Sequence, residues 1–214
     1  MNTQRSPLIA VLLMLVASPA MALPWHWGVR AGLNAANFAG EFGDIVHPDL
    51  RYGLNAGLVG DAGLTRDLSL HVEGAYSSKG GKATQQSIDN AGNPAGTFDE
   101  TWTFNYVEVP VLLRGRLRGH GNAGLFAELG PSFGIAVNGR FEPGIPGLPK
   151  RDFKKDMKPI DPDFAAGVGV EFAAGPGRLG IEARYTRGFS DLFDLADNAT
   201  SINQVWTLAP SWTR

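Results

Sequence analysis

The residues of this chain with the clearest capacity for chemistry are acids and arginines that alternate with apolar residues. These residues lie in eight segments with a period of two, and within each segment they share one face. Several of them lie at similar distances from the short connections between the segments. Charges on a face shielded from water must pair with opposite charges or change their protonation. We therefore expect a buried charged network made of Arg30, Glu73, Glu108, Arg114, Glu128, Glu171, Glu182 and Arg184.

Ser69, His71 and Glu73 supply the residue types of a nucleophile, a base and an acid on one face of one segment. Side chains two positions apart on a strand lie about 7 Å from each other, which is long for a hydrogen bond between a nucleophile and its base. We therefore predict no enzymatic activity, no catalytic residues and no cofactor, and we keep a lipid-active enzyme as the weakest alternative.

Two segments near residue 155 carry concentrated charge. Lys150–Lys158 is mostly basic, which is typical of a solvated loop and also suits contact with anionic lipopolysaccharide or an outside partner. Asp161-Pro162-Asp163 offers two carboxylates to a hard cation, but three residues do not make a calcium loop. We therefore predict no metal site.

The composition narrows the class of protein. The 214 residues are 43% hydrophobic and 19% charged, with a formal net charge of −2, which argues against a nucleic-acid binder. The absence of cysteine excludes a disulfide scaffold and a thiolate metal site.

The first 22 residues have the pattern of a secretory signal peptide. Arg5 precedes an apolar run of ten residues, 8–17, and Ala20-Met21-Ala22 follows with small residues at the cleavage positions. The alternative is a short buried helix, because ten apolar residues are too few to span a bilayer. We predict a mature domain over residues 23–214.

Apolar and polar residues alternate with a period of two in eight segments, which is typical of strands with two different faces. In the first segment, for example, Val29 and Leu33 alternate with Arg30 and Asn34. The eight segments are 25–35, 51–58, 68–79, 107–116, 123–133, 164–172, 178–186 and 202–212.

The connections between the segments are alternately long and short. The long ones are 39–50, 80–100, 139–162 and 190–201, and the short ones are 65–67, 119–122 and 174–177. An even number of strands with long loops at one end and short turns at the other matches a transmembrane β-barrel, in which closure satisfies every backbone group. We therefore predict an all-β fold, an eight-stranded antiparallel up-and-down transmembrane barrel.

The two faces decide between a membrane barrel and a soluble barrel of lipocalin type. A lipocalin would turn its apolar face inward around a greasy ligand, whereas here the candidate inner face carries charge and glycine. Aromatic residues fall near both ends of the outward face, as expected of interfacial girdles. They are Trp25, Trp27, Phe172 and Trp212 at the short-turn end and Tyr52, Tyr76, Phe133, Phe164 and Tyr185 at the long-loop end.

Pro110 stands inside a predicted strand, although a closed barrel has only central strands and proline has no N–H for the ladder. We expect a bulge or a local register change at this residue. The shift of the apolar residues from even positions in 102–106 to odd positions from Val107 favours the same interpretation.

Four motifs, in order and at the right spacing, resemble the PorT-like outer membrane β-barrel family. They are Gly28–Asn34, Glu73–Gly80, the Tyr-x-Glu-x-Pro strand Tyr106–Leu113, and Gly130-Pro131, within a resemblance that runs from about Trp27 to Phe189. The resemblance implies an outer membrane barrel of a Gram-negative bacterium, and the secretion role that gave the family its name is not carried over. The chain ends on Thr213-Arg214, whereas many such barrels end on an aromatic residue that the barrel assembly machinery reads.

Three functions are consistent with this pattern. We favour a structural or interaction barrel, plugged by its charged network, whose long loops meet an extracellular ligand or protein. The alternative is a narrow solute or ion pore, and the enzyme is third. The expected partners are outer membrane lipids, lipopolysaccharide and the barrel assembly machinery, with no nucleic acid.

Overall fold

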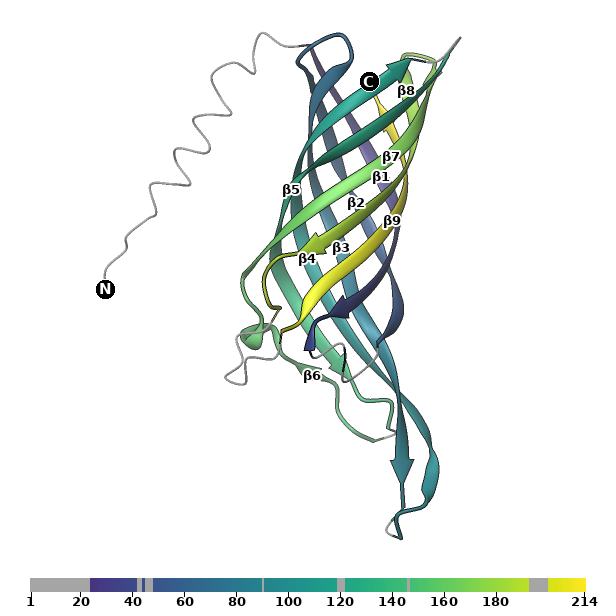
Figure 1. Cartoon of the computed structure of the whole chain (residues 1–214), viewed down its shortest axis with the longest axis vertical. Coiled ribbons are helices and arrows are strands. Elements are labelled where there is room, and N and C mark those ends of the chain that lie inside the picture. The colour runs from purple at the N-terminus through teal and green to yellow at the C-terminus, as the bar shows by residue number, and fades with distance from the viewer. Residues whose placement is uncertain are drawn as a thin grey trace, which may run out of the picture.

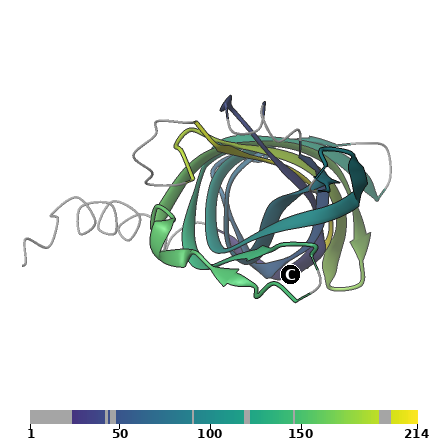
Figure 2. The ribbon, with the colours of Figure 1, turned by 90° about the horizontal axis from the view of Figure 1, so that it is seen from below.

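The computed structural model describes residues 24–41, 44, 48–89, 91–118, 122–145, 147–192 and 200–214, and these form one closed antiparallel barrel (Figures 1 and 2). The expected signal peptide, residues 1–22, lies outside the described residues. The described part of the chain contains no helix long and apolar enough to cross a membrane.

Eight long strands make the ring, and each pairs with its neighbours in the antiparallel sense. They are β1 (Trp25–Ala39), β2 (Asp49–Gly63), β3 (Leu68–Ile88), β4 (Pro94–Arg118), β5 (Ala123–Glu142), β7 (Ile160–Ala174), β8 (Gly177–Gly188) and β9 (Ile202–Thr213). The β1–β9 pairing closes the ring, so the predicted eight-stranded barrel is confirmed. The short β6 (Arg151–Asp152) pairs only with the end of β5 and is followed by a 3-10 helix, η1 (Lys154–Asp156).

The period-two pattern gives the barrel an apolar outside and a polar inside. Leu33, Leu54 and Leu208 face outward in one row across β2, β1 and β9, and each is more than half exposed. Asn34, the next residue of β1, is fully buried inside. This assignment is the reverse of a lipocalin, and it leaves an apolar surface that only lipid can cover.

β3 and β4 continue past the rest of the barrel as a two-stranded arm, seen at the bottom of Figure 1. The expectation of a loop over 80–100 is therefore wrong: pairing runs to Ile88 and Pro94, and a tight turn joins the strands. Both faces of the arm are in water, so its sequence lacks the alternation that marks strands in a bilayer. Backbone N–H groups of Asn93 and Ala91 donate to the Asp89 carboxylate and hold the pKa of Asp89 below its usual range.

The long connection predicted over 139–162 also contains strand structure. β5 continues to Glu142, and the segment after it returns to the barrel through β6 and η1. The backbone N–H of Phe153 donates to the carbonyl of Gly139 at 3.1 Å. A Cβ at Gly139 would collide with Met157 and Phe153, so this glycine lets the segment lie against β5.

The bulge expected at Pro110 lies elsewhere. The register between β4 and β5 shifts between Asn105 and Tyr106, whereas it is the same on both sides of Pro110. Even positions of β4 face inward from Trp102 to Arg114, including that of Tyr106. The change of apolar parity in the sequence therefore reflects apolar residues inside the barrel near the long-loop end, and the strand does not turn over.

Two equally exposed leucines test whether the outer face meets lipid. Leu33 is 61% exposed in the middle of β1, and Leu148 is 52% exposed in the connection outside the ring. Leu33→Arg is expected to lower the free energy of unfolding in phospholipid vesicles by about 2–4 kcal/mol, because it places a charge in hydrocarbon. Leu148→Arg is expected to change it by less than about 0.5 kcal/mol. Equal small effects in a urea titration would contradict the membrane assignment.

Candidate functional site in the barrel lumen

Strand register brings inward charges of three strands, and a glycine of a fourth, into one row. Arg114 on β4 lies opposite Glu128 on β5, which lies opposite Gly167 on β7, and Gly167 lies opposite Arg184 on β8. An eight-stranded barrel leaves room for side chains and little else, so a glycine in this row gives space to the long side chains beside it. The Arg184 side chain can therefore reach across the lumen.

Arg184 is the centre of the charged cluster. Its guanidinium contacts Glu128 at 2.7 Å and Glu182 at 2.6 Å, and it also binds both carboxylate oxygens of Glu73. All four side chains are at least 94% buried. The three carboxylates are close enough to share a metal ion, and the cation that they share is this guanidinium.

Two further arginines complete the pairing. Arg30 on β1 donates to Glu73 at 2.6 Å, and Arg114 donates to Glu128 at 2.6–2.7 Å while its guanidinium lies 4.4 Å from the centre of the Phe126 ring. A Cβ at Gly169 would collide with Phe126, so this glycine makes room for the stacked pair. We define the ionic core as Arg30, Asp61, His71, Glu73, Arg114, Glu128, Glu182 and Arg184.

His71 bridges two acids of the ionic core. Its Nδ1 lies 3.1 Å from Asp61 and its Nε2 lies 2.8 Å from Glu73, so both ring nitrogens face carboxylates. The hydroxyl of Ser69 donates to Asp61 and accepts from Arg116. The nucleophile–base contact that catalysis by Ser69 and His71 would need is therefore not formed, since both partners of His71 are carboxylates.

The structure places all eight residues of the expected charged network on the inner face, and Arg116 joins Glu171 to Asp61 of the ionic core. Six belong to the ionic core. Glu171 lies near the short-turn end, where it contacts Arg116 at 3.4 Å and the half-exposed Arg178 at 3.2 Å. Glu108 lies nearer the long-loop end and pairs with Lys79. Among the described residues, Glu108 is the member of the expected network that no ion pair joins to the ionic core.

Several buried charges were missing from the sequence-based set. Asp61 lies beyond the predicted end of its strand, because the alternation weakens after Leu58, while β2 continues to Gly63. Lys79 lies on the polar face of the predicted segment 68–79. Its side chain is 1% exposed and pairs with Glu108 and, at 3.0 Å, with Asp163. Both residues continue the series of polar positions along their strands, and this pattern could have predicted that they face inward.

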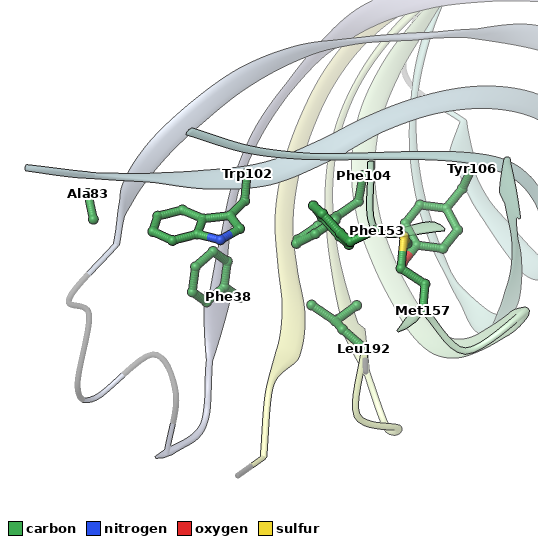
Figure 3. Close-up of a cluster of buried hydrophobic side chains, with 8 residues drawn as sticks. All are labelled: Phe38, Ala83, Trp102, Phe104, Tyr106, Phe153, Met157 and Leu192. Atoms are coloured by element: carbon green, nitrogen blue, oxygen red, sulfur yellow. The ribbon is translucent and has the colours of Figure 1, made fainter. Parts of the chain in front are cut away.

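An apolar cluster lies in the lumen at the long-loop end (Figure 3). The ring of Phe38 packs edge-on against Trp102, and that of Phe104 against Phe153, with centroids 5.6 Å apart in each pair. We call it the mouth cluster, made of Phe38, Ala83, Trp102, Phe104, Tyr106, Phe153, Met157 and Leu192. Because Phe153 and Met157 come from the connection after β5, this connection folds over the mouth of the barrel.

The nine aromatic residues expected in girdles all lie on the outside of the barrel. Seven are 40–70% exposed: Trp25, Trp27, Tyr52, Tyr76, Phe133, Phe164 and Phe172. Tyr185 and Trp212 are partly covered by aromatic neighbours, Trp206 at 4.9 Å and Trp27 at 6.4 Å between ring centroids. Trp206, which is 58% exposed, was not among the expected residues. That these residues mark the membrane interfaces stays a prediction.

Residues 4–194 match the model of a family described as outer membrane protein beta-barrel domain. The chain belongs to this family. The outer membrane barrel that it describes agrees with the closed ring and the apolar outer face. The protein is therefore an integral protein of the outer membrane of a Gram-negative bacterium. No curated protein matches the chain.

Solved structures with a similar backbone include three outer membrane proteins. They are Ail, the attachment invasion locus protein of Yersinia pestis (12% identity, TM-score 0.43, covering 90% of this chain and all of that one), Neisserial surface protein A (9%, 0.46, 86% and 95%) and the outer membrane protease OmpT of Escherichia coli (12%, 0.43, 88% and 95%). The first was solved in complex with the heparin analogue sucrose octasulfate.

Two arginines test whether the ionic core is dry. Arg184→Met leaves three buried carboxylates without their shared cation, and it is expected to lower the free energy of unfolding by about 3–5 kcal/mol. Arg178→Met removes a half-exposed arginine from one carboxylate, and less than about 1 kcal/mol is expected. Urea titrations in vesicles measure both values, and a small effect of Arg184→Met would mean that water fills the lumen.

Proposed function

We propose that this protein is a plugged outer membrane barrel that acts through the structures it displays at its long-loop end. The observation that carries the proposal is the filling of the lumen. The ionic core spans it with arginines that each reach more than one strand, and the mouth cluster covers it on the long-loop side. The barrel then serves as a rigid base for the arm and the loops.

A narrow pore is the alternative, and the same contacts argue against it. An ion crossing the lumen would have to separate Arg184 from Glu73, Glu128 and Glu182, which are buried together. It would also have to pass the aromatic rings of the mouth cluster. Breaking a buried pair costs about 3–5 kcal/mol, so the closed state is favoured.

Catalysis is not part of the proposed function. His71 holds two carboxylates, and the hydroxyl of Ser69 is engaged by Arg116 and Asp61. These contacts position neither group for attack on a lipid or a peptide bond.

The long-loop end carries basic side chains that can bind anionic surfaces and strand edges that can pair with an extended peptide segment. Arg151, Lys154 and Lys155 are exposed on the connection that covers the mouth, which suits lipopolysaccharide phosphates or an acidic ligand. Beyond Lys82 and Thr101 no barrel strand that the structure describes pairs with the arm, and Gly144 lies against its β4 edge at Asp99. We propose lipopolysaccharide and an extracellular ligand or protein as partners at this end, and the barrel assembly machinery as the partner during insertion.

Within the family we propose that the chain belongs to the PorT-like branch. The support is the Tyr-x-Glu-x-Pro strand, whose Tyr106, Glu108 and Pro110 are all buried on the inner face. Glu108 pairs with Lys79, the lysine of a second motif that carries the resemblance.

Conductance tests the plug directly. The folded chain, checked by its shifted gel mobility before and after boiling, is expected to give no steady openings in a planar bilayer. Glu73→Gln in the ionic core and Glu41→Gln, at an exposed position two residues after β1, are expected to behave alike. Steady openings whose size changes in Glu73→Gln and not in Glu41→Gln would show a pore and contradict the proposal.

The proposed display requires the arm to face outward from the cell. An epitope inserted after Gly92, at the tip of the arm, is expected to bind antibody on intact cells. The matched insertion after Arg66, in the short turn at the other end (Figure 1), is expected to bind only after permeabilisation. The reverse pattern of labelling would contradict the proposed orientation.

A further inference from the structure

Three carboxylates gather beneath the mouth cluster at the long-loop end of the lumen. Glu108 comes from β4, and Asp161 and Asp163 come from the start of β7. Asp161 and Asp163 are each 2% exposed, and Glu108 is 7% exposed. They are distinct from the ionic core, with which they form no ion pair among the described residues.

The positive charge beside these acids is smaller than the negative charge. Lys79 pairs with Glu108 and with Asp163, and it is the one cation among the described residues that forms an ion pair with any of the three carboxylates. Two negative charges therefore remain when all three carboxylates are ionised. Burying such an excess is costly unless a cation or protons neutralise it.

The two aspartates use one carboxylate oxygen each to bind a neighbouring side chain and direct the other oxygen toward Gly188. The Oδ2 atoms are engaged, that of Asp161 by the amide of Asn203 at 2.7 Å and that of Asp163 by Lys79 at 3.0 Å. The Oδ1 atoms both face Gly188, whose ideal Cβ position lies 3.3 Å from Asp161 Oδ1 and 3.2 Å from Asp163 Oδ1. Glycine at this position therefore leaves a space next to both carboxylate oxygens, bordered by the Cγ2 methyl group of Ile202 at 3.1 Å.

Neither Oδ1 atom is well satisfied by a donor. Among the described residues, Asp163 Oδ1 has no hydrogen-bond partner although the side chain is completely buried. In the part of the chain that the structure describes, Asp161 Oδ1 accepts a hydrogen bond only from the hydroxyl of Ser190, at 3.4 Å. The buried Oδ1 of Asn203 also lacks a donor among the described residues. A surplus of buried acceptors beside a surplus of negative charge suits a cation, because a cation satisfies both.

We propose that Asp161 and Asp163 bind a hard divalent cation of the calcium type beside Gly188. Its ligands from this chain are the two Oδ1 atoms and the Ser190 hydroxyl, all oxygens of the kind that such cations prefer. The double positive charge equals the excess that Lys79 leaves. The cation links the start of β7 to Ser190, which follows β8.

The test uses terbium(III), a luminescent substitute for calcium, on the full folded chain in detergent micelles. Tyr106, whose hydroxyl lies 3.5 Å from the amide of Asn203, is placed to sensitise the emission. We expect saturable emission from one site that calcium competes away. Asp163→Asn is expected to weaken binding by about tenfold or more, the scale of losing a group that supports a metal site.

Two further variants keep the test decisive. Gly188→Ala retains every charge but puts a methyl group next to both oxygens, and it is expected to weaken terbium binding about as much as Asp163→Asn. Asp156→Asn removes an exposed carboxylate at the same end and is expected to leave affinity unchanged. No saturable emission, or equal affinity in the wild type, Asp163→Asn and Gly188→Ala, would overturn the proposal. If Asp163→Asn does not fold, Gly188→Ala decides alone.

Discussion

The rest of this structure depends on the contact between the Arg184 guanidinium and three buried carboxylates. A sheet in hydrocarbon must close on itself, and eight strands leave a lumen that holds only side chains. The polar face of every strand is then forced into that lumen, where its charges must find partners inside the protein. Arg184 reaches Glu73 on β3, Glu128 on β5 and Glu182 on its own strand, and it thereby connects strands on different sides of the ring.

The lumen changes in character from one end to the other, and this gradient supports the proposal that the long-loop end acts on the surroundings. At the short-turn end Glu171 and the half-exposed Arg178 form a pair that water can reach. The ionic core follows, then the acids around Lys79, and last the apolar mouth cluster. The longest segments outside the ring lie on the long-loop side. They are the arm and the connection after β5, which contains Phe153 and Met157. A closed lumen beneath an elaborate outer end favours display over transport.

The sequence was sufficient for the strands, the faces and the closure, because a bilayer enforces the period of two on each strand. The sequence was insufficient for the parts of the strands that lie outside the bilayer. The arm lies in water on both faces, so 80–100 resembled a loop. The grouping of charges was also beyond reach, because parity places Glu108 and Glu128 on one face without fixing how far each strand is shifted against its neighbours. Asp161-Pro162-Asp163 was visible as a motif, but Gly188 and Asn203 join it only through the register of β7, β8 and β9.

The claim that the lumen is dry and closed is tested most directly by a double-mutant cycle on Arg114 and Glu128, which contact each other at 2.6–2.7 Å. Arg114→Met, Glu128→Gln and the double variant are unfolded in urea from phospholipid vesicles. A dry ionic core predicts a coupling energy above about 2 kcal/mol, since each single variant leaves a buried partner unmatched. A coupling energy below about 1 kcal/mol, the value of pairs in water, would show a hydrated lumen and contradict the plug.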